Sequence, residues 1–201
     1  MKKWLFPILG IGVFILIAVF WYFSVINKAV EVNEAVRKEW ANVNTSYQRR
    51  NDLIGNLVKT VKGAADFEKS TLEAVINARS NATGIKIDPT NITPEQLQQF
   101  NQAQSGLSSA LSRLLVTVEK YPDLKANQNF LKLQDELAST ENQILTARTR
   151  FNEKVEIYNN YVLKMPRKIF LSDYKEKAYF ESVEGAEKPV DVEFDFSNKS
   201  E

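Results

Sequence analysis

One short motif in this sequence matches a known catalytic pattern: Ser172 is followed three positions later by Lys175. In penicillin-binding enzymes, this S-x-x-K spacing places a lysine beside a serine nucleophile. The companion S-D-N and K-T-G elements are absent from the sequence, and the chain is too short for that fold. We therefore interpret the motif as a surface turn and predict no catalytic residues.

Histidine and cysteine, on which much enzyme and metal chemistry depends, are both absent. Ser-His-Asp and Cys-His catalysis, histidine-based metal centres and disulfides are therefore excluded. Carboxylates could still bind a hard cation, but here they are interleaved with Lys and Arg, as on a solvated helix surface. We expect neither a metal nor another cofactor. A hydrolase or transferase that uses carboxylate or Ser-Lys chemistry is kept as an alternative.

Arg50 is the polar residue with the most unusual position, because it interrupts a stripe of apolar residues. The stripe comprises Val36, Trp40, Val43, Tyr47, Ile54, Leu57 and Val61. Together with Arg50, these residues alternate steps of four and three, which is the pattern of a heptad seam. A guanidinium buried there needs a carboxylate, and the candidates on later helices are Glu119, Glu136 and Glu141. Arg50 is then either half of a structural ion pair or a contact for a partner protein.

The helices that carry these residues follow an apolar stretch, Trp4–Phe23, which contains no charged residue. As a helix it would span about 30 Å, the hydrocarbon thickness of a bilayer. Aromatic residues lie at both ends, as at membrane interfaces, and Lys2 and Lys3 lie just outside. We predict an uncleaved transmembrane anchor, because a signal peptide would have a shorter apolar core and a small-residue cleavage site.

After the anchor, the chain is helical in period and predicts an all-α, antiparallel up-and-down bundle over residues 28–164. Gly63, the loop Gly84–Pro94 and Tyr121-Pro122 divide it into four helices, or three if Gly63 does not bend the chain. Thr93, Pro94 and Gln96 form a capping box. A second seam, with the same spacing as the first, should face it; it comprises Phe130, Leu133, Leu137, Thr140, Ile144, Ala147, Phe151, Val155 and Tyr158.

Residues 165–201 lack helical period and predict an irregular, acidic C-terminal tail. Within it, Val190, Val192, Phe194 and Phe196 alternate with acidic residues, which is the period of a β-strand. A helical bundle offers this strand no sheet edge. The segment is therefore a disordered tail, an apolar strip lying between helices, or a strand that adds to a partner's sheet.

Two long runs of this sequence resemble the signature of the LemA family. They are VRKEWANVNTSYQRRNDLIGNLVKTVKGAADFEKSTLEAVINARSNA, from Val36 to Ala82, and RLLVTVEKYPDLKANQNFLKLQDELASTENQILTARTRFNEKVEIYN, from Arg113 to Asn159. Gly55 stands where the family commonly has proline, and Ile26-Asn27 where it often has Tyr-Asn. The resemblance implies a bacterial membrane protein with one N-terminal span and a helical bundle, and it brings no catalytic residues.

These observations favour a protein–protein interaction or scaffolding module, held in the bacterial cytoplasmic membrane by a single pass and bound to protein partners. Nucleic acid is not an expected partner, because 26 Lys and Arg nearly balance 25 Asp and Glu. Lys2 and Lys3 on the short N-terminal tail favour placing the bundle on the outer side of the membrane. Direct membrane remodelling is a third alternative.

Overall fold

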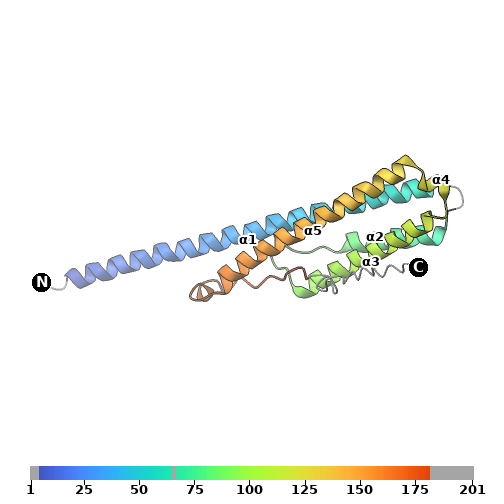
Figure 1. Ribbon diagram of the computed structural model, residues 1–201. Helices are drawn as coiled ribbons and strands as arrows, with labels where there is room; N and C mark the ends of the chain where they lie inside the picture. Colours follow the sequence, from blue (N-terminus) through green and yellow to red (C-terminus); the bar gives the residue numbers. More distant parts are fainter. Residues whose placement is uncertain (1–4, 65–66, 182–201) are drawn as a thin grey trace, which may run out of the picture.

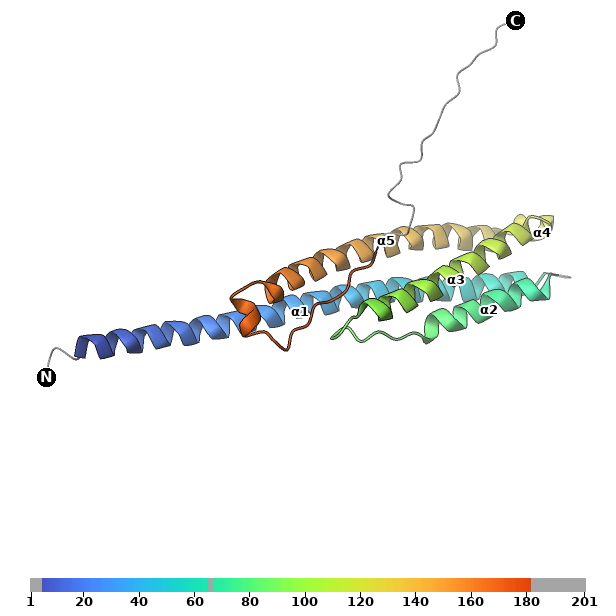
Figure 2. The same ribbon diagram turned by 90° about the horizontal axis from the view of Figure 1, so that it is seen from below.

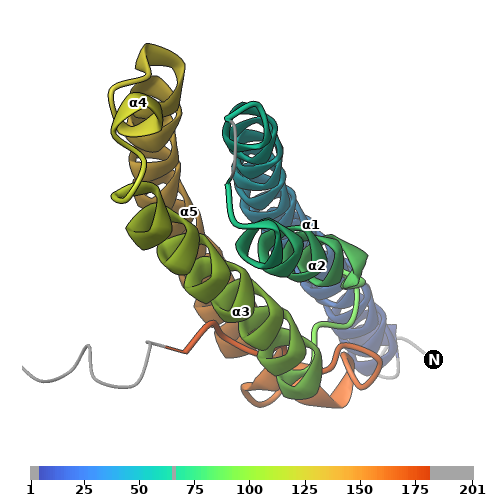
Figure 3. The same ribbon diagram turned by 90° about the vertical axis from the view of Figure 1, so that its right-hand side faces the viewer.

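The computed structural model describes residues 5–64 and 67–181. Its elements in chain order are α1 (Leu5–Lys62), α2 (Lys69–Gly84), α3 (Pro94–Val118), the short α4 (Pro122–Lys125), α5 (Gln128–Leu163) and the 3-10 turn η2 (Arg167–Ile169). Helices α1 and α5 form one layer, and α2 and α3 form a second layer beside it (Figures 1 and 3). The all-α bundle predicted from the sequence is confirmed.

Helix α1 is a single helix of 58 residues, about 87 Å long at 1.5 Å per residue. No proline follows Pro7 until Pro89, so nothing in the sequence breaks the helix at its exit from the apolar segment. Its first part projects beyond the bundle (Figure 2), and its side chains from Leu9 to Phe23 are exposed. From Val25 onward its apolar stripe is buried. Residues 5–27 and 28–62 therefore share one element, without a break between them.

The two predicted seams face each other along α1 and α5, which pack side by side in opposite directions (Figure 1). Nearer the apolar end, the shared core is aromatic. There, the rings of Phe100, Phe151 and Phe180 surround Trp40 at centroid distances of 5.8, 5.5 and 6.0 Å. Toward the other end, Ile54, Leu57 and Val61 pack in a mainly aliphatic cluster with Phe130 and Leu137. Leu133 is only partly buried.

Helices α2 and α3 pack against each other, and α2 also lies along α1. The capping box at the start of α3 is present: Gln96 N donates to Thr93 Oγ1 at 3.3 Å, and Thr93 N donates to Gln96 Oε1 at 3.1 Å. In α2, Leu72 and Val75 are buried, but Ile76 is 48% exposed. It lies one residue beyond Val75 and therefore about 100° around the helix.

Helix α1 ends at Lys62, and the N–H of the next residue, Gly63, donates to Lys59 O and Thr60 O at 3.3 Å each. At the other end of the chain, residues 165–181 are irregular, as expected. However, they pack on the bundle instead of leaving it: Leu171 and Phe180 belong to the aromatic core. The sequence did not indicate this packing, because the buried Leu171 and Phe180 lie in a segment without helical periodicity.

Candidate functional site

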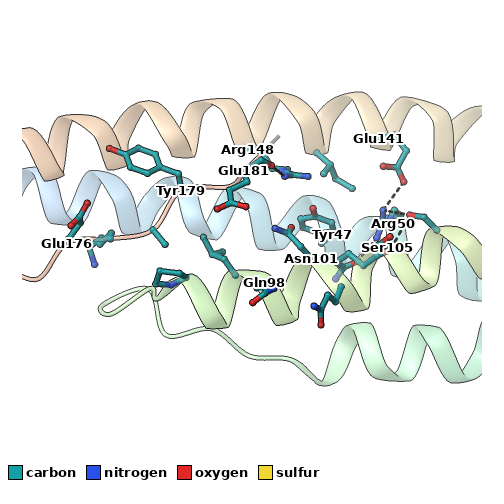
Figure 4. Close-up of a pocket in the computed structure, with 18 residues that line it drawn as sticks. Tyr47, Arg50, Gln98, Asn101, Ser105, Glu141, Arg148, Glu176, Tyr179 and Glu181 are labelled. Atoms are coloured by element: carbon teal, nitrogen blue, oxygen red, sulfur yellow. Dashed lines mark hydrogen bonds and ion pairs between the residues drawn. The ribbon is translucent and has the colours of Figure 1, made fainter. Parts of the chain in front are cut away.

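An open groove lies between α3 and α5, with α1 as its floor (Figure 4). Its volume is about 1350 Å³. The polar lining residues are Tyr47 and Arg50 from α1, Gln98, Asn101, Gln102, Gln104, Ser105 and Ser108 from α3, Glu141 and Arg148 from α5, and Glu176, Lys177, Tyr179 and Glu181 from the C-terminal segment. The glutamine-rich start of α3 thus forms one wall of the groove.

Arg50 lies at the floor of this groove and is only 3% exposed. Its Nη1 donates to Glu141 Oε1 at 3.0 Å and lies 3.5 Å from Ser108 Oγ. Its Nη2 donates to Gln104 Oε1 in a short hydrogen bond. The guanidinium carbon also lies 5.1 Å from the centre of the Tyr47 ring. The Arg50 side chain of α1 therefore hydrogen-bonds with both α3 and α5.

The network continues through Gln104, whose Nε2 donates to Ala82 O of α2 at 3.4 Å. All four long helices thus meet through Arg50 and Gln104. Since the fork of a guanidinium offers several donors in a fixed plane, Arg50 is suited to this junction. Among the described residues, its buried Nε has no hydrogen-bond partner.

Of the three acids proposed from the sequence, the structure brings only Glu141 to Arg50. Glu119 pairs instead with Lys125 at the turn after α3. Glu136 lies five residues before Glu141 on the same helix, about 140° around the axis, and so points elsewhere. The Glu141 side chain is 50% exposed whereas that of Arg50 is 4% exposed, so the pair spans the groove from floor to mouth.

Arg148 provides a second cation at the groove. Its Nη2 donates to Glu181 O at 2.9 Å, and its guanidinium lies 4.6 Å from the centre of the Phe180 ring. Burial raises the pKa of the Tyr47 hydroxyl, and the positive charges of Arg148 and Arg50 act in the opposite direction. The phenol therefore stays neutral at physiological pH, and its hydroxyl can hydrogen-bond with Arg148.

An extended segment, residues 175–181, closes one end of the groove and was not foreseen. Two asparagines of α5 hold its backbone, each through a donor and an acceptor. Asn159 pairs with N and O of Lys177 at 2.9 and 2.8 Å, and Asn152 pairs with N and O of Phe180 at 2.9 and 2.8 Å. The available signal was their spacing of seven, with each asparagine directly after a seam aromatic, Phe151 or Tyr158.

Lys177 is a second buried cation that sequence reasoning missed. Its Nζ donates to the carbonyls of Pro89 and Thr90 at 3.0 and 2.6 Å, and it lies 5.1 Å from the centre of the Tyr158 ring. Burial lowers the pKa of this ammonium to about 8, while the charge of Asp88 acts in the opposite direction. Lys177 thus fastens the extended segment to the loop between α2 and α3.

The Ser172 and Lys175 side chains are both exposed. The backbone carbonyl of Lys175 accepts a hydrogen bond from the Tyr158 hydroxyl at 3.0 Å, which gives the motif a structural contact. Within residues 5–64 and 67–181, no group of three or more acidic side chains could hold a metal ion. The proposed strand residues Val190, Val192, Phe194 and Phe196 lie outside the described residues.

The fold and the groove together define a class: a helical bundle built on a long helix whose apolar part projects from it, with a buried arginine beneath an open polar groove. The chain belongs to the LemA family, whose model matches residues 39–194. That range includes the whole Arg50 network and the two asparagines that hold the extended segment.

Three relatives illustrate the range of similarity. Magnetosome protein MamQ 2 of Paramagnetospirillum magneticum is 26% identical over 183 residues, which cover 82% of this chain and 67% of the relative. MamQ of Magnetospirillum gryphiswaldense is 25% identical, with the same coverage. Protein LemA of Metamycoplasma hominis is 25% identical over 158 residues, covering 79% of this chain and 67% of the relative. None of these three names specifies a reaction.

Proposed function

We propose that this protein is a membrane-anchored protein-binding module of the bacterial cytoplasmic membrane, and that the groove over Arg50 receives its partner. The observation that carries the proposal is the continuity of α1. Within one helix, exposed apolar side chains from Leu9 to Phe23 give way to the buried stripe that begins at Val25. Such a helix would hold the bundle rigidly above the bilayer, with the groove open to one side.

The chemistry of the groove favours an extended polypeptide as the ligand. Its α3 wall presents the amides of Gln98, Asn101 and Gln102, which can donate to and accept from a peptide backbone. The neighbouring wall already binds an extended chain in this way, since Asn152 and Asn159 each pair with the backbone of residues 175–181. A partner segment would continue the same mode of recognition along α5.

The charges of the groove further define the partner segment. Arg148 lies half-buried on the α5 side, and Glu141 shields Arg50 at the mouth. An acidic side chain of the partner could approach Arg148, whereas a basic one would meet Glu141. A segment that carries both signs is therefore complementary to the two groups.

A photo-crosslinking amino acid at Gln102, which lines the groove, tests this proposal in native membranes. The matched control carries the same group at Lys132, which is exposed on α5 and lies outside the groove lining. We expect a discrete adduct from position 102 that is absent from position 132. Equal labelling from both positions, or none from either, would contradict a role for the groove.

The anchor and its orientation need a separate experiment. We propose that the bundle lies on the outer side of the membrane, because Lys2 and Lys3 form the short flank that tends to stay inside. Protease added to intact spheroplasts should then digest the bundle. Protection of the bundle until the membrane is permeabilised would reverse the orientation, and release of the whole chain by alkaline carbonate would contradict the anchor.

A further inference from the structure

The turn that follows α5 lies beside α1 at the point where the exposed apolar part of α1 ends. We call residues 164–170 the basal loop; it contains η2. The Phe170 ring packs edge-on against Trp21 and Tyr22, with centroid distances of 5.5 and 5.9 Å. Just above it, the Tyr161 hydroxyl donates to Val25 O at 3.1 Å. These contacts fix the height of the loop along α1.

The basal loop exposes large apolar side chains that a water-facing turn would not need. Met165, Ile169 and Phe170 are 67%, 63% and 42% exposed. They continue the exposed apolar surface of α1, since Phe170 touches Trp21 and Tyr22 directly. A contiguous apolar surface of this kind marks an interaction site, and here it joins the part of the chain that enters the bilayer.

Cations are interleaved with these apolar side chains. Lys164 and Lys168 are exposed, and the Arg167 guanidinium lies 4.3 Å from the centre of the Tyr161 ring. The loop contains no acidic residue. Apolar and aromatic side chains mixed with Lys and Arg are typical of segments that lie in the interface plane of an anionic membrane.

We propose that the basal loop is a second membrane contact, which inserts into the headgroup layer of the bilayer that α1 spans. Met165, Ile169 and Phe170 then reach the acyl boundary, and Lys164 and Lys168 bind lipid phosphates. The inference rests on the proposed anchor. The height of the loop supports it: Trp21 and Tyr22 are the interfacial aromatics of the anchor, and Phe170 lies within 6 Å of both, whereas the headgroup layer is about 5–8 Å thick on each side.

A second contact has a mechanical consequence. A single straight helix can rotate about its axis and tilt freely in the bilayer, whereas a helix with an adjoining inserted loop has a fixed rotational setting. The basal loop therefore determines which way the groove between α3 and α5 faces relative to the membrane. It also selects for membranes that contain anionic lipids.

The absence of cysteine from the chain makes a direct depth measurement simple. The full chain carrying Ile169→Cys is spin-labelled and reconstituted into vesicles that contain phosphatidylglycerol and phosphatidylcholine. The collision rates of the label with oxygen and with a water-soluble nickel chelate give its depth. Phe14→Cys within the apolar part of α1 and Ile157→Cys on exposed α5 serve as references, since both side chains are exposed in the structure.

We expect the Ile169 label to have a severalfold higher ratio of oxygen to nickel collisions than the Ile157 label, and a lower ratio than the Phe14 label. A deep Phe14 label with an aqueous Ile169 label overturns the inference and leaves the anchor intact. An aqueous Phe14 label overturns the anchor and the inference together. Spin–spin broadening at Ile169 that disappears on dilution with unlabelled chain would show that a second copy covers the loop, and would also overturn the inference.

The lipid preference has its own test. In the Ile169→Cys background, Lys164→Gln with Lys168→Gln removes the two exposed cations and leaves Arg167 on Tyr161. We expect this variant to make the label depth equal in anionic and in pure phosphatidylcholine vesicles, whereas the parent label lies deeper in the anionic ones. A parent label whose depth does not depend on lipid charge would contradict the role of Lys164 and Lys168.

Discussion

Arg50 and Lys177 are both buried cations, and the protein holds them in contrasting ways. Arg50 bonds to a carboxylate, an amide oxygen and a hydroxyl from two other helices. Lys177 bonds to two backbone carbonyls and lies near the face of a tyrosine ring. Burial lowers the pKa of Lys177 to about 8. The carboxylate beside Arg50, by contrast, offsets the desolvation of its charge.

The two cations differ in whether a molecule in the solvent can reach the groups that bind them. Glu141 connects Arg50 to the solvent at the mouth of the groove, so a ligand can bind to the pair from outside. Lys177 is enclosed by the loop between α2 and α3 and by α5, and it joins two segments of this chain. This contrast is the reason that the proposed binding surface includes Arg50, whereas Lys177 belongs to the framework that closes the end of the groove.

The largest expected effect comes from Glu141→Ala, which leaves the Arg50 guanidinium buried with its charge uncompensated. Breaking a buried pair costs about 3–5 kcal/mol, and we expect about 2–3 kcal/mol here because Glu141 is half exposed and partly screened. Urea unfolding of the full chain in detergent micelles measures the loss. Glu136→Ala, on another face of α5, is the control and should change stability by less than about 0.5 kcal/mol.

Arg50→Lys sharpens the comparison by placing an ammonium where the guanidinium belongs. A lysine can still reach Glu141, but it lacks the fork that also serves Gln104 and Ser108. Because Gln104 Oε1 would then be buried without a donor, we expect a loss of about 1–2 kcal/mol in the same unfolding experiment. Wild-type stability in this variant would contradict the importance of the fork.

The smallest effect at neutral pH should come from Lys177→Met, which loses two hydrogen bonds but also removes a desolvated charge. We expect a change within about 1 kcal/mol. The pH dependence is more informative. Since the pKa of Lys177 is lowered in the folded state, the folded chain binds fewer protons than the unfolded chain above pH 8, and stability should rise from about pH 8 toward the normal lysine pKa of about 10.4.

The comparison of wild type with Lys177→Met isolates this rise. The raised pKa values of Tyr47 and Tyr158 act in the opposite direction, but only above about pH 10, where tyrosine normally begins to ionise. Unfolding of both chains between pH 8 and pH 10 is therefore the useful measurement. A rise of equal size in the two chains would show that Lys177 does not cause it.

The two cations also differ in how well the sequence predicted their positions. Arg50 was recognisable because it interrupts a regular stripe, and its candidate partners followed from the need to compensate a buried charge. Only the fold could identify Glu141 among the three acids, since the pairing depends on the register in which α5 packs against α1. The helices, the capping box and the facing seams follow from local chemistry and were confirmed.

Lys177 was not recognisable, because it lies in a segment without periodicity. Its burial depends on pairing with Asn159, 18 residues away, and on the carbonyls of Pro89 and Thr90, nearly 90 residues away. Neither contact leaves a pattern in the sequence around Lys177 itself. The groove was missed for a similar reason: its α3 wall has the composition of a solvated surface, and only the tertiary arrangement places it opposite α5.

The central claim is that a partner occupies the groove over Arg50. A matched pair of substitutions on exposed serines of α3 tests it most directly: Ser105 lines the groove, whereas Ser109, about one turn further along, does not. With the crosslinker at Gln102, Ser105→Arg should abolish the adduct in native membranes, and Ser109→Arg should leave it at the wild-type level. Equal adduct yields from the two variants would contradict the claim.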